Sequence, residues 1–137
     1  MGQQQLLLLI LGGVIVGIAV SIAIVIFQDN AITKNKEAIT NDLLQLAVKA
    51  QHYYYRPKSM GGGSHSFVGL TADSLGLHKI STIEFSDNSN GKYSIITAGD
   101  ASHVIFKGVG NVELEDGTFP TLTLTVTPQG QVLSILN

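Results

Sequence analysis

The chain has 137 residues, enough for one small domain with an appendage. Charged residues make up 13% of it and hydrophobic residues 45%, a balance that excludes a disordered or polyelectrolyte chain. Eight Lys and Arg against ten Asp and Glu give a net charge of −2, so the basic surface typical of nucleic-acid binding is missing and we predict no nucleic-acid partner. Cysteine is absent, which excludes disulfides, thiolate metal sites and a cysteine nucleophile.

The N-terminal segment is uncharged and strongly apolar. The first charged side chain is Asp29, and only three glycines and Ser21 interrupt the apolar run over residues 6–27. A helix of that length spans about 33 Å, which is enough to cross the hydrocarbon core of a bilayer. A cleaved signal peptide is the alternative, but no Lys or Arg precedes the run, which is also longer than a signal-peptide core. We therefore predict a membrane-spanning or filament-core helix over residues 1–28.

The charges that follow the span bear on its orientation. Lys34 and Lys36 lie on the C-terminal side, partly offset by Asp29 and Glu37. The positive-inside rule alone would keep this side in the cytoplasm. The bias is small, and the following domain has the composition of a surface module. We therefore expect the C-terminal side at the cell surface, reached through the cytoplasmic membrane.

Residues 29–57 change from uniformly apolar to amphipathic. Apolar side chains recur at spacings of 7, 4, 3, 4 and 3, as on one face of a helix: Ile32, Ile39, Leu43, Leu46, Ala50 and Tyr53. Pro is absent before Pro57, so one continuous helix of about 80 Å is predicted, with a bend near residues 28–31 left open. Pro57 and the glycines at 61–63 are expected to end this helix.

Residues 58–137 have the composition of a β domain. Short segments rich in β-branched residues, separated by turn signals, predict strands at 66–70, 79–85, 92–98, 103–107, 112–115, 121–127 and 131–136. In the segment 121–127, threonines alternate strictly with Leu122, Leu124 and Val126. This pattern indicates a strand with one solvent-exposed face and one buried face. Gly130 is expected at positive φ in the turn between the last two strands.

The predicted sheet must bury one face, and the amphipathic stripe is the only long element available to cover it. We therefore predict an α+β fold, a long N-terminal helix packed on a small C-terminal antiparallel sheet. The side chains expected to make the helix–sheet contact are Ile39, Leu43, Leu46, Ala50 and Tyr53.

This arrangement resembles the type IV pilins and the pseudopilins of type II secretion. The segment 42–57 is also similar to the way those helices end, in small residues, aromatics and a proline. The resemblance implies a subunit that is inserted in the membrane and then extracted into a helical filament with apolar helices at its centre. It implies as partners other copies of the chain, the membrane before assembly, and a pilus assembly machinery.

Processing and the N-terminal residues differ from the bacterial pattern. Gly2 is the candidate processing position, because leaders in those families end in glycine, but no Lys or Arg precedes it. Bacterial pilins carry Glu at the fifth mature position. Here the fifth residue is Gln5 when counted from Met1, or Leu7 when counted after Gly2. We therefore predict a divergent, pilin-like filament protein and not a standard pilin.

Two groups of residues are candidates for assembly contacts. Gly13, Gly17 and Ser21 are four residues apart and would let neighbouring helix backbones approach closely; the alternative is that glycine is simply common in transmembrane helices. The second group would make polar contacts between protomers in the filament core, or else be solvated at the headgroup level: Gln3, Gln4 and Gln5.

The sequence contains no recognisable catalytic or metal-binding pattern. The histidines lack metal-ligand spacing: His52, His65, His78 and His103. The glycine run at 61–63 lacks the Lys and Ser/Thr of a phosphate loop and is interpreted as a flexible or interface-forming connector. The acidic residues at 113–116 lack calcium-loop spacing, and Gly-x-Ser-x-Gly is absent. We expect no enzyme activity, cofactor or metal.

These features predict a structural subunit of an extracellular type IV pilus-like filament. The alternative is a minor pseudopilin, or a membrane-anchored β module that binds another envelope protein. Both alternatives share the fold with the filament subunit and lack the polymer.

Overall fold

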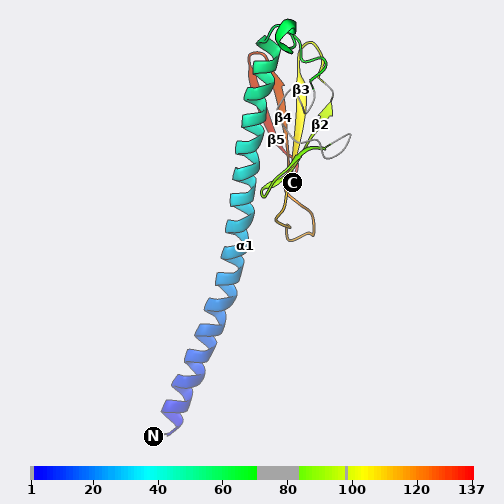
Figure 1. The fold of residues 1–137 in the computed structure, drawn as a ribbon. Helices are drawn as coiled ribbons and strands as arrows, with labels where there is room; N and C mark the ends of the chain where they lie inside the picture. The colour runs from blue at the N-terminus through cyan, green and yellow to red at the C-terminus, as the bar shows by residue number, and fades with distance from the viewer. Residues whose placement is uncertain (1, 71–83, 98) are drawn as a thin grey trace.

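The computed structural model describes residues 2–70, 84–97 and 99–137 (Figure 1). One helix, α1 (Gly2–Tyr55), runs the full length of the molecule, and its C-terminal half packs against an antiparallel sheet. The predicted α+β fold is confirmed. With 54 residues, α1 is about 80 Å long and extends far beyond the sheet. It continues unbroken through residues 28–31, where the sequence left a bend open.

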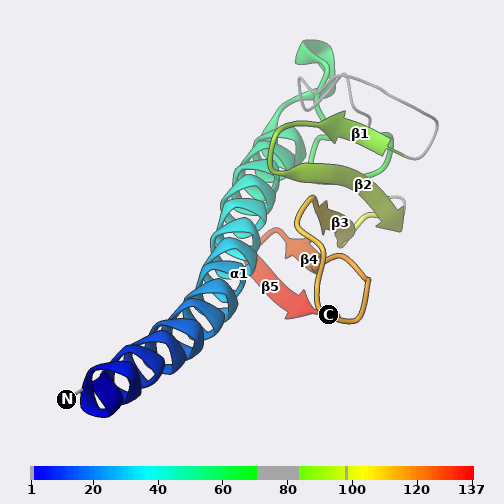
Figure 2. The same ribbon diagram turned by 90° about the horizontal axis from the view of Figure 1, so that it is seen from below.

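The sheet is a five-stranded meander. A single 3-10 turn, η1 (Lys58–Met60), follows the helix. The strands are β1 (Glu84–Asp87), β2 (Gly91–Thr97), β3 (Val104–Gly110), β4 (Thr121–Thr127) and β5 (Gly130–Ile135). Each strand pairs antiparallel with the next, so the order across the sheet follows the chain. The helix lies over β3 and β4, with β5 beside it at one edge of the sheet (Figure 2).

The core lies between α1 and the middle of the sheet. In β4 the alternation expected from the sequence is observed: Leu122, Leu124 and Val126 are buried, while the threonines are partly exposed. Glycine in β3 allows the helix to come close. A Cβ atom on Gly108 would lie 2.5 Å from Cγ2 of Ile39, and one on Gly110 would collide with Asn35. The small residues of β3 therefore set the short distance between helix and sheet.

Two predicted strands are wrong, and both form turns. In the first, at 66–70, the amide of Leu70 donates to the carbonyl of Phe67 at 3.1 Å, and Gly69 has a φ of +83°. Phe67 and Leu70 are buried in the core, so their apolar character anchors a turn instead of a strand face.

The second wrong strand, at 112–115, belongs to the connection between β3 and β4. The amide of Leu114 donates to Thr118 at 2.7 Å, and Gly117 closes the turn with a φ of +79°. Local hydrogen bonds to turn residues thus outweigh the β propensity of the segment. The predicted strand at 79–85 lies outside the described residues up to position 83, and Glu84 begins β1.

The expected positive φ at Gly130 is also wrong, because that residue lies outside the left-handed region. Thr127 pairs directly with Gly130, so the loop consists of Pro128 and Gln129. Pro128 supplies a fixed negative φ at the first loop position, and the turn closes without a glycine in the left-handed region.

Candidate assembly surface

The N-terminal half of α1 is exposed, and we call its residues 6–27 the bare segment. Its large apolar side chains between Leu6 and Phe27 are all exposed, and the most apolar window of the helix is 0% buried. This helix is long and apolar enough to cross a membrane. A soluble monomer does not leave so large an apolar surface in water, because burying it is strongly favourable. Lipid or other protein chains must therefore cover this half of α1.

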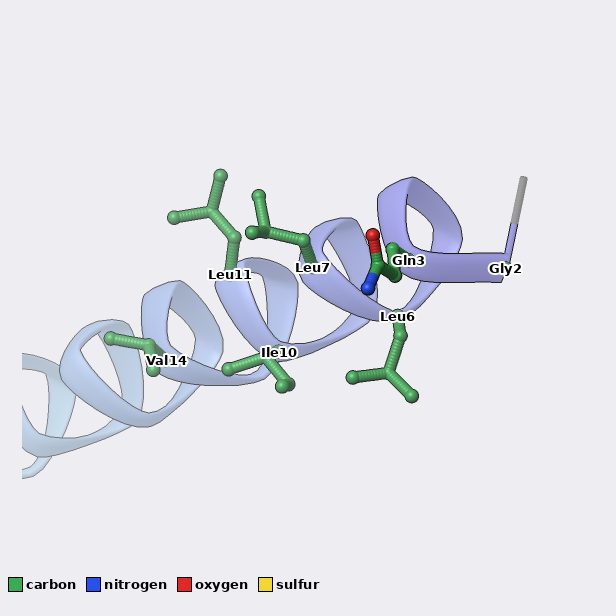
Figure 3. A pocket seen from close by; sticks show the side chains of 7 residues that line it. All are labelled: Gly2, Gln3, Leu6, Leu7, Ile10, Leu11 and Val14. Atoms are coloured by element: carbon green, nitrogen blue, oxygen red, sulfur yellow. The ribbon is translucent and has the colours of Figure 1, made fainter.

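The first turns of α1 carry a shallow groove made by this helix alone. Its lining residues are Gly2, Gln3, Leu6, Leu7, Ile10, Leu11 and Val14. In Figure 3, Leu7 and Leu11 project on one side of the helix, and Leu6 on the other. Residues four apart form such ridges, and the groove between two ridges accepts a ridge of a neighbouring helix. The ridges and groove of this segment are therefore suited to packing against another helix.

The three small residues lie on one face of the bare half. A Cβ atom on Gly13 or Gly17 would meet nothing within 4 Å, so no contact within the described chain requires glycine there. The hydroxyl of Ser21 donates to the carbonyl of Gly17 at 2.9 Å, which satisfies its polar group within the helix. This face is flat and open to close approach by a second backbone. Gln3, Gln4 and Gln5 are exposed in the first turn of α1.

The C-terminal half of α1 holds the domain. The five side chains expected at the helix–sheet contact are all buried in the core: Ile39, Leu43, Leu46, Ala50 and Tyr53. Ile32 is half-buried and lines a small hollow together with Gln28 and the β3–β4 connection at residues 112–115. The domain therefore reaches down to the point where the bare segment of α1 begins.

Asn35 fixes the end of the sheet nearest the bare segment. Its Nδ2 donates to the carbonyl of Asn90 at 2.8 Å, and its Oδ1 accepts from the amide of Asn111 at 3.2 Å. One buried side chain thus holds both the β1–β2 turn and the β3–β4 connection. The sequence analysis missed this residue, although it lies four positions before Ile39 on the buried stripe. A polar residue on an apolar stripe is the signal that would have identified it.

Asp42 makes the second polar anchor. Its Oδ2 accepts hydrogen bonds from the side-chain amides of Asn88 and Asn90, at 2.9 Å each, and from the hydroxyl of Tyr93. Burial raises the pKa of this carboxyl, but the three hydrogen bonds together outweigh it and hold the pKa below its usual value. Burial and the bond to Asp42 raise the pKa of Tyr93 far above its usual value. The sequence analysis did not identify Asp42 as an anchor.

The glycine run caps the C-terminal end of α1. Gly63 donates to the carbonyl of Tyr53 at 2.8 Å, Ser64 to Arg56 at 2.9 Å, and His65 to Tyr54 at 2.7 Å. The amides of Gly63 and His65 satisfy carbonyls of the last turn of α1, and the amide of Ser64 satisfies that of Arg56 just after it, so these amides are not free to bind a phosphate. Tyr53 and Tyr54 pack on the core, as expected for Tyr53, while Tyr55 is exposed.

A Ser, a His and an Asp meet in the turn before β3 without the geometry of a catalytic triad. Ser102 Oγ lies 3.2 Å and Asp100 Oδ2 3.1 Å from the same nitrogen, Nδ1 of His103. A triad needs the serine at the opposite ring nitrogen, Nε2. Asp100 instead accepts from the amides of His103 and Ser102, which lower its pKa to about 2.

Metal binding has no support in the part of the chain that the structure describes. There, no group of three or more His, Asp or Glu side chains is placed to hold an ion. His52 and His65 are exposed and lie in separate elements, and His78 is outside the described residues. No protein-family model, curated protein or solved structure matches the chain.

Proposed function

We propose that this protein is a structural subunit of an extracellular type IV pilus-like filament. In such a filament the bare halves of α1 form the central bundle and the sheets form the outer surface. The observation that carries the proposal is the continuity of α1, which runs from the exposed apolar segment into the domain core without a break. The apolar half of α1 and the domain are therefore joined by one continuous helix. A subunit that leaves the membrane without refolding requires such a junction.

The energetics favour assembly once the subunit has left the lipid. Burial of apolar surface from water is worth about 25 cal/mol per Å². The exposed side chains between Leu6 and Phe27 supply this surface around the whole helix. A membrane anchor that carries a binding module needs the apolar span, but it needs neither a rigid junction nor a flat small-residue face.

The proposal includes partners and a place in the cell. The subunit is held in the cytoplasmic membrane before assembly and contacts other copies of itself in the filament. An assembly machinery of the pilus type moves it to the cell surface. Gly2 is the proposed processing position, so cleavage there would leave Gln3 as the first residue.

The small-residue face offers the most selective test. Replacing both Gly13 and Gly17 by Leu fills this face, while Ala19→Leu with Ala23→Leu adds comparable bulk to another face of the helix. Both double variants remain apolar enough to enter the membrane. We expect the first to lose filaments from sheared surface material, and the control to retain them, because close backbone approach is possible on one face only.

Three outcomes separate the candidates. Loss of filaments in the first variant alone supports helix packing through Gly13 and Gly17. Equal assembly of both variants contradicts that packing. If the unaltered protein stays in the membrane as a monomer or small complex, the filament proposal fails, and the membrane-anchored module takes its place.

A further inference from the structure

β5 is the edge strand of the sheet, and its apolar side chains are uncovered. Leu133 pairs with Leu124, and Ile135 with Leu122, so both point to the face that α1 covers. The two β4 residues are almost fully buried, whereas Leu133 is 38% and Ile135 61% exposed. The helix therefore covers β4 and leaves the neighbouring strand open. We call Leu133 and Ile135 the β5 strip.

The β5 edge lacks the residues that usually prevent an edge strand from pairing with another molecule. No Asp, Glu, Lys or Arg follows Asp116 in the sequence, and β5 contains no proline. Charged side chains and proline are the usual means of protecting an edge strand from another chain. At the other end of the described sheet, β1 carries the exposed Asp87. Within the described ranges no strand pairs with the outer side of β5. An apolar edge of this kind is typical of a contact surface.

The strip continues onto the helix. Gln51 and Tyr55 donate to the carbonyls of Thr127 and Pro128 at the β4–β5 turn, each at 3.2 Å. Val48 lies on the same helix face, at helical spacing from both, and is half exposed. Both views show β5 beside α1 (Figures 1 and 2). Strand and helix thus present one apolar side, directly above the bare segment of α1.

We propose that a second copy of this chain covers the β5 strip, through the apolar segment 6–27 of its α1. The inference rests on the proposed filament. The strip and this segment match in chemistry, because the chain has no charged side chain before Asp29 or after Asp116. Pairing of β5 with β5 would close a symmetric dimer, whereas a filament needs two different surfaces in each contact. The apolar helix is the surface that differs from the strip and matches it.

The first test places charge in the strip. Leu133→Lys with Ile135→Lys puts two lysines on the helix-facing side, while Val132→Lys with Ser134→Lys puts them on the other side of the same strand. We expect filament yield in sheared material to fall at least about tenfold for the strip variant, because a charge cannot be buried against an apolar helix. The control should stay within about twofold of the unaltered protein. Thermal unfolding of the detergent-solubilised chains checks that both variants fold.

Cross-linking identifies the occupant directly and does not depend on the folding of a lysine variant. Benzoylphenylalanine in place of Ile135 is photolysed in assembled material, and the adduct is mapped by mass spectrometry. An adduct with residues 6–27 of a second copy supports the inference. An adduct with another protein, with lipid or with a β-strand of a second copy overturns it, and so does no adduct at all.

The two proposals fail in different ways. If the unaltered protein forms filaments and the strip variant forms them equally well, the strip inference is wrong and the filament proposal stands. If the unaltered protein forms no filaments, the proposed function is wrong, and the strip inference falls with it.

Discussion

The hydroxyl of Tyr93 on β2 donates a hydrogen bond to the carboxylate of Asp42 on α1. The same carboxylate oxygen holds the β1–β2 turn through Asn88 and Asn90. Asn35, two helical turns earlier, holds that turn as well and adds the β3–β4 connection. The end of the sheet nearest the bare segment is thus fixed to the helix by directional bonds, and the apolar core fixes the rest.

Loss of the Asp42 carboxylate should weaken this junction. Asp42→Ala leaves the partly buried donors of Asn90 and Tyr93 without their acceptor, so we expect the free energy of unfolding to fall by about 1–3 kcal/mol. Chemical denaturation of the full chain in detergent, followed by far-UV circular dichroism, measures the change. Glu37→Ala is the matched control, since Glu37 is exposed on the same helix. Equal stability of the two variants would contradict the anchoring role.

The junction should also respond to acid. The pKa of Asp42 is lower in the folded chain than its ordinary value of 3.8, so the folded state favours the deprotonated carboxyl. This contribution is fully present above the ordinary value and is lost as pH falls through the lowered pKa. The stability difference between the unaltered protein and Asp42→Asn should therefore shrink as pH falls from about 5 through 3.8 and below. A difference that grows on acidification would reverse the sign of the shift.

Glycine at position 108 should be required by the approach of the helix. Gly108→Ala adds a Cβ atom 2.5 Å from Cγ2 of the buried Ile39, which should destabilise the fold by about 1–3 kcal/mol. Gly130→Ala is the control, because its Cβ atom would meet nothing within 4 Å. Ile39→Ala removes the clashing methyl, so its cost and that of Gly108→Ala should not add in the double variant. Strict additivity, measured by denaturation, would contradict the clash.

The turn before β3 should contain an unusually acidic carboxyl. The amides of His103 and Ser102, and then the hydroxyl of Ser102, hold the pKa of Asp100 at about 2. Carboxyl-detected NMR titration should show Ser102→Ala raising this pKa more than His103→Ala does. Both variants retain their backbone amides, but Ser102→Ala removes the hydroxyl that donates to Asp100, whereas His103→Ala removes only the weaker effect of the imidazole. Stability linked to this group is present above its usual value and disappears as pH falls through about 2. A larger effect of His103→Ala would mean that the imidazole dominates.

Most of the fold could be predicted from the periodicity of apolar residues in the sequence. The apolar stripe from Ile39 to Tyr53 predicted the covered face of the helix, and the alternation from Leu122 to Val126 predicted the buried face of β4, because both patterns extend over several turns or pairs. The turn at Phe67 could not be predicted in this way, since two apolar anchors three residues apart also suit a strand. Asn35 and Asp42 act through partners more than 45 residues away, which a local pattern does not contain.

The assembly surface was predictable only in part. Composition alone marks residues 6–27 as a segment that must be covered. The β5 strip could not be predicted, because the sequence pattern of Leu133 and Ile135 is that of ordinary buried strand residues. Their exposure follows only from the structure, in which α1 covers β3 and β4 but not β5. Which surface of a neighbour covers residues 6–27 depends on another chain, and a local sequence pattern does not contain that information.

Electron cryo-microscopy of material sheared from producing cells, with mass spectrometry of its N-terminus, tests the central proposal most directly. The account predicts thin helical fibres built from this chain, with the bare halves of α1 bundled at the centre and the sheets outside. Protein that remains in the membrane as monomers or small complexes, with no such fibres in the sheared material, would contradict it.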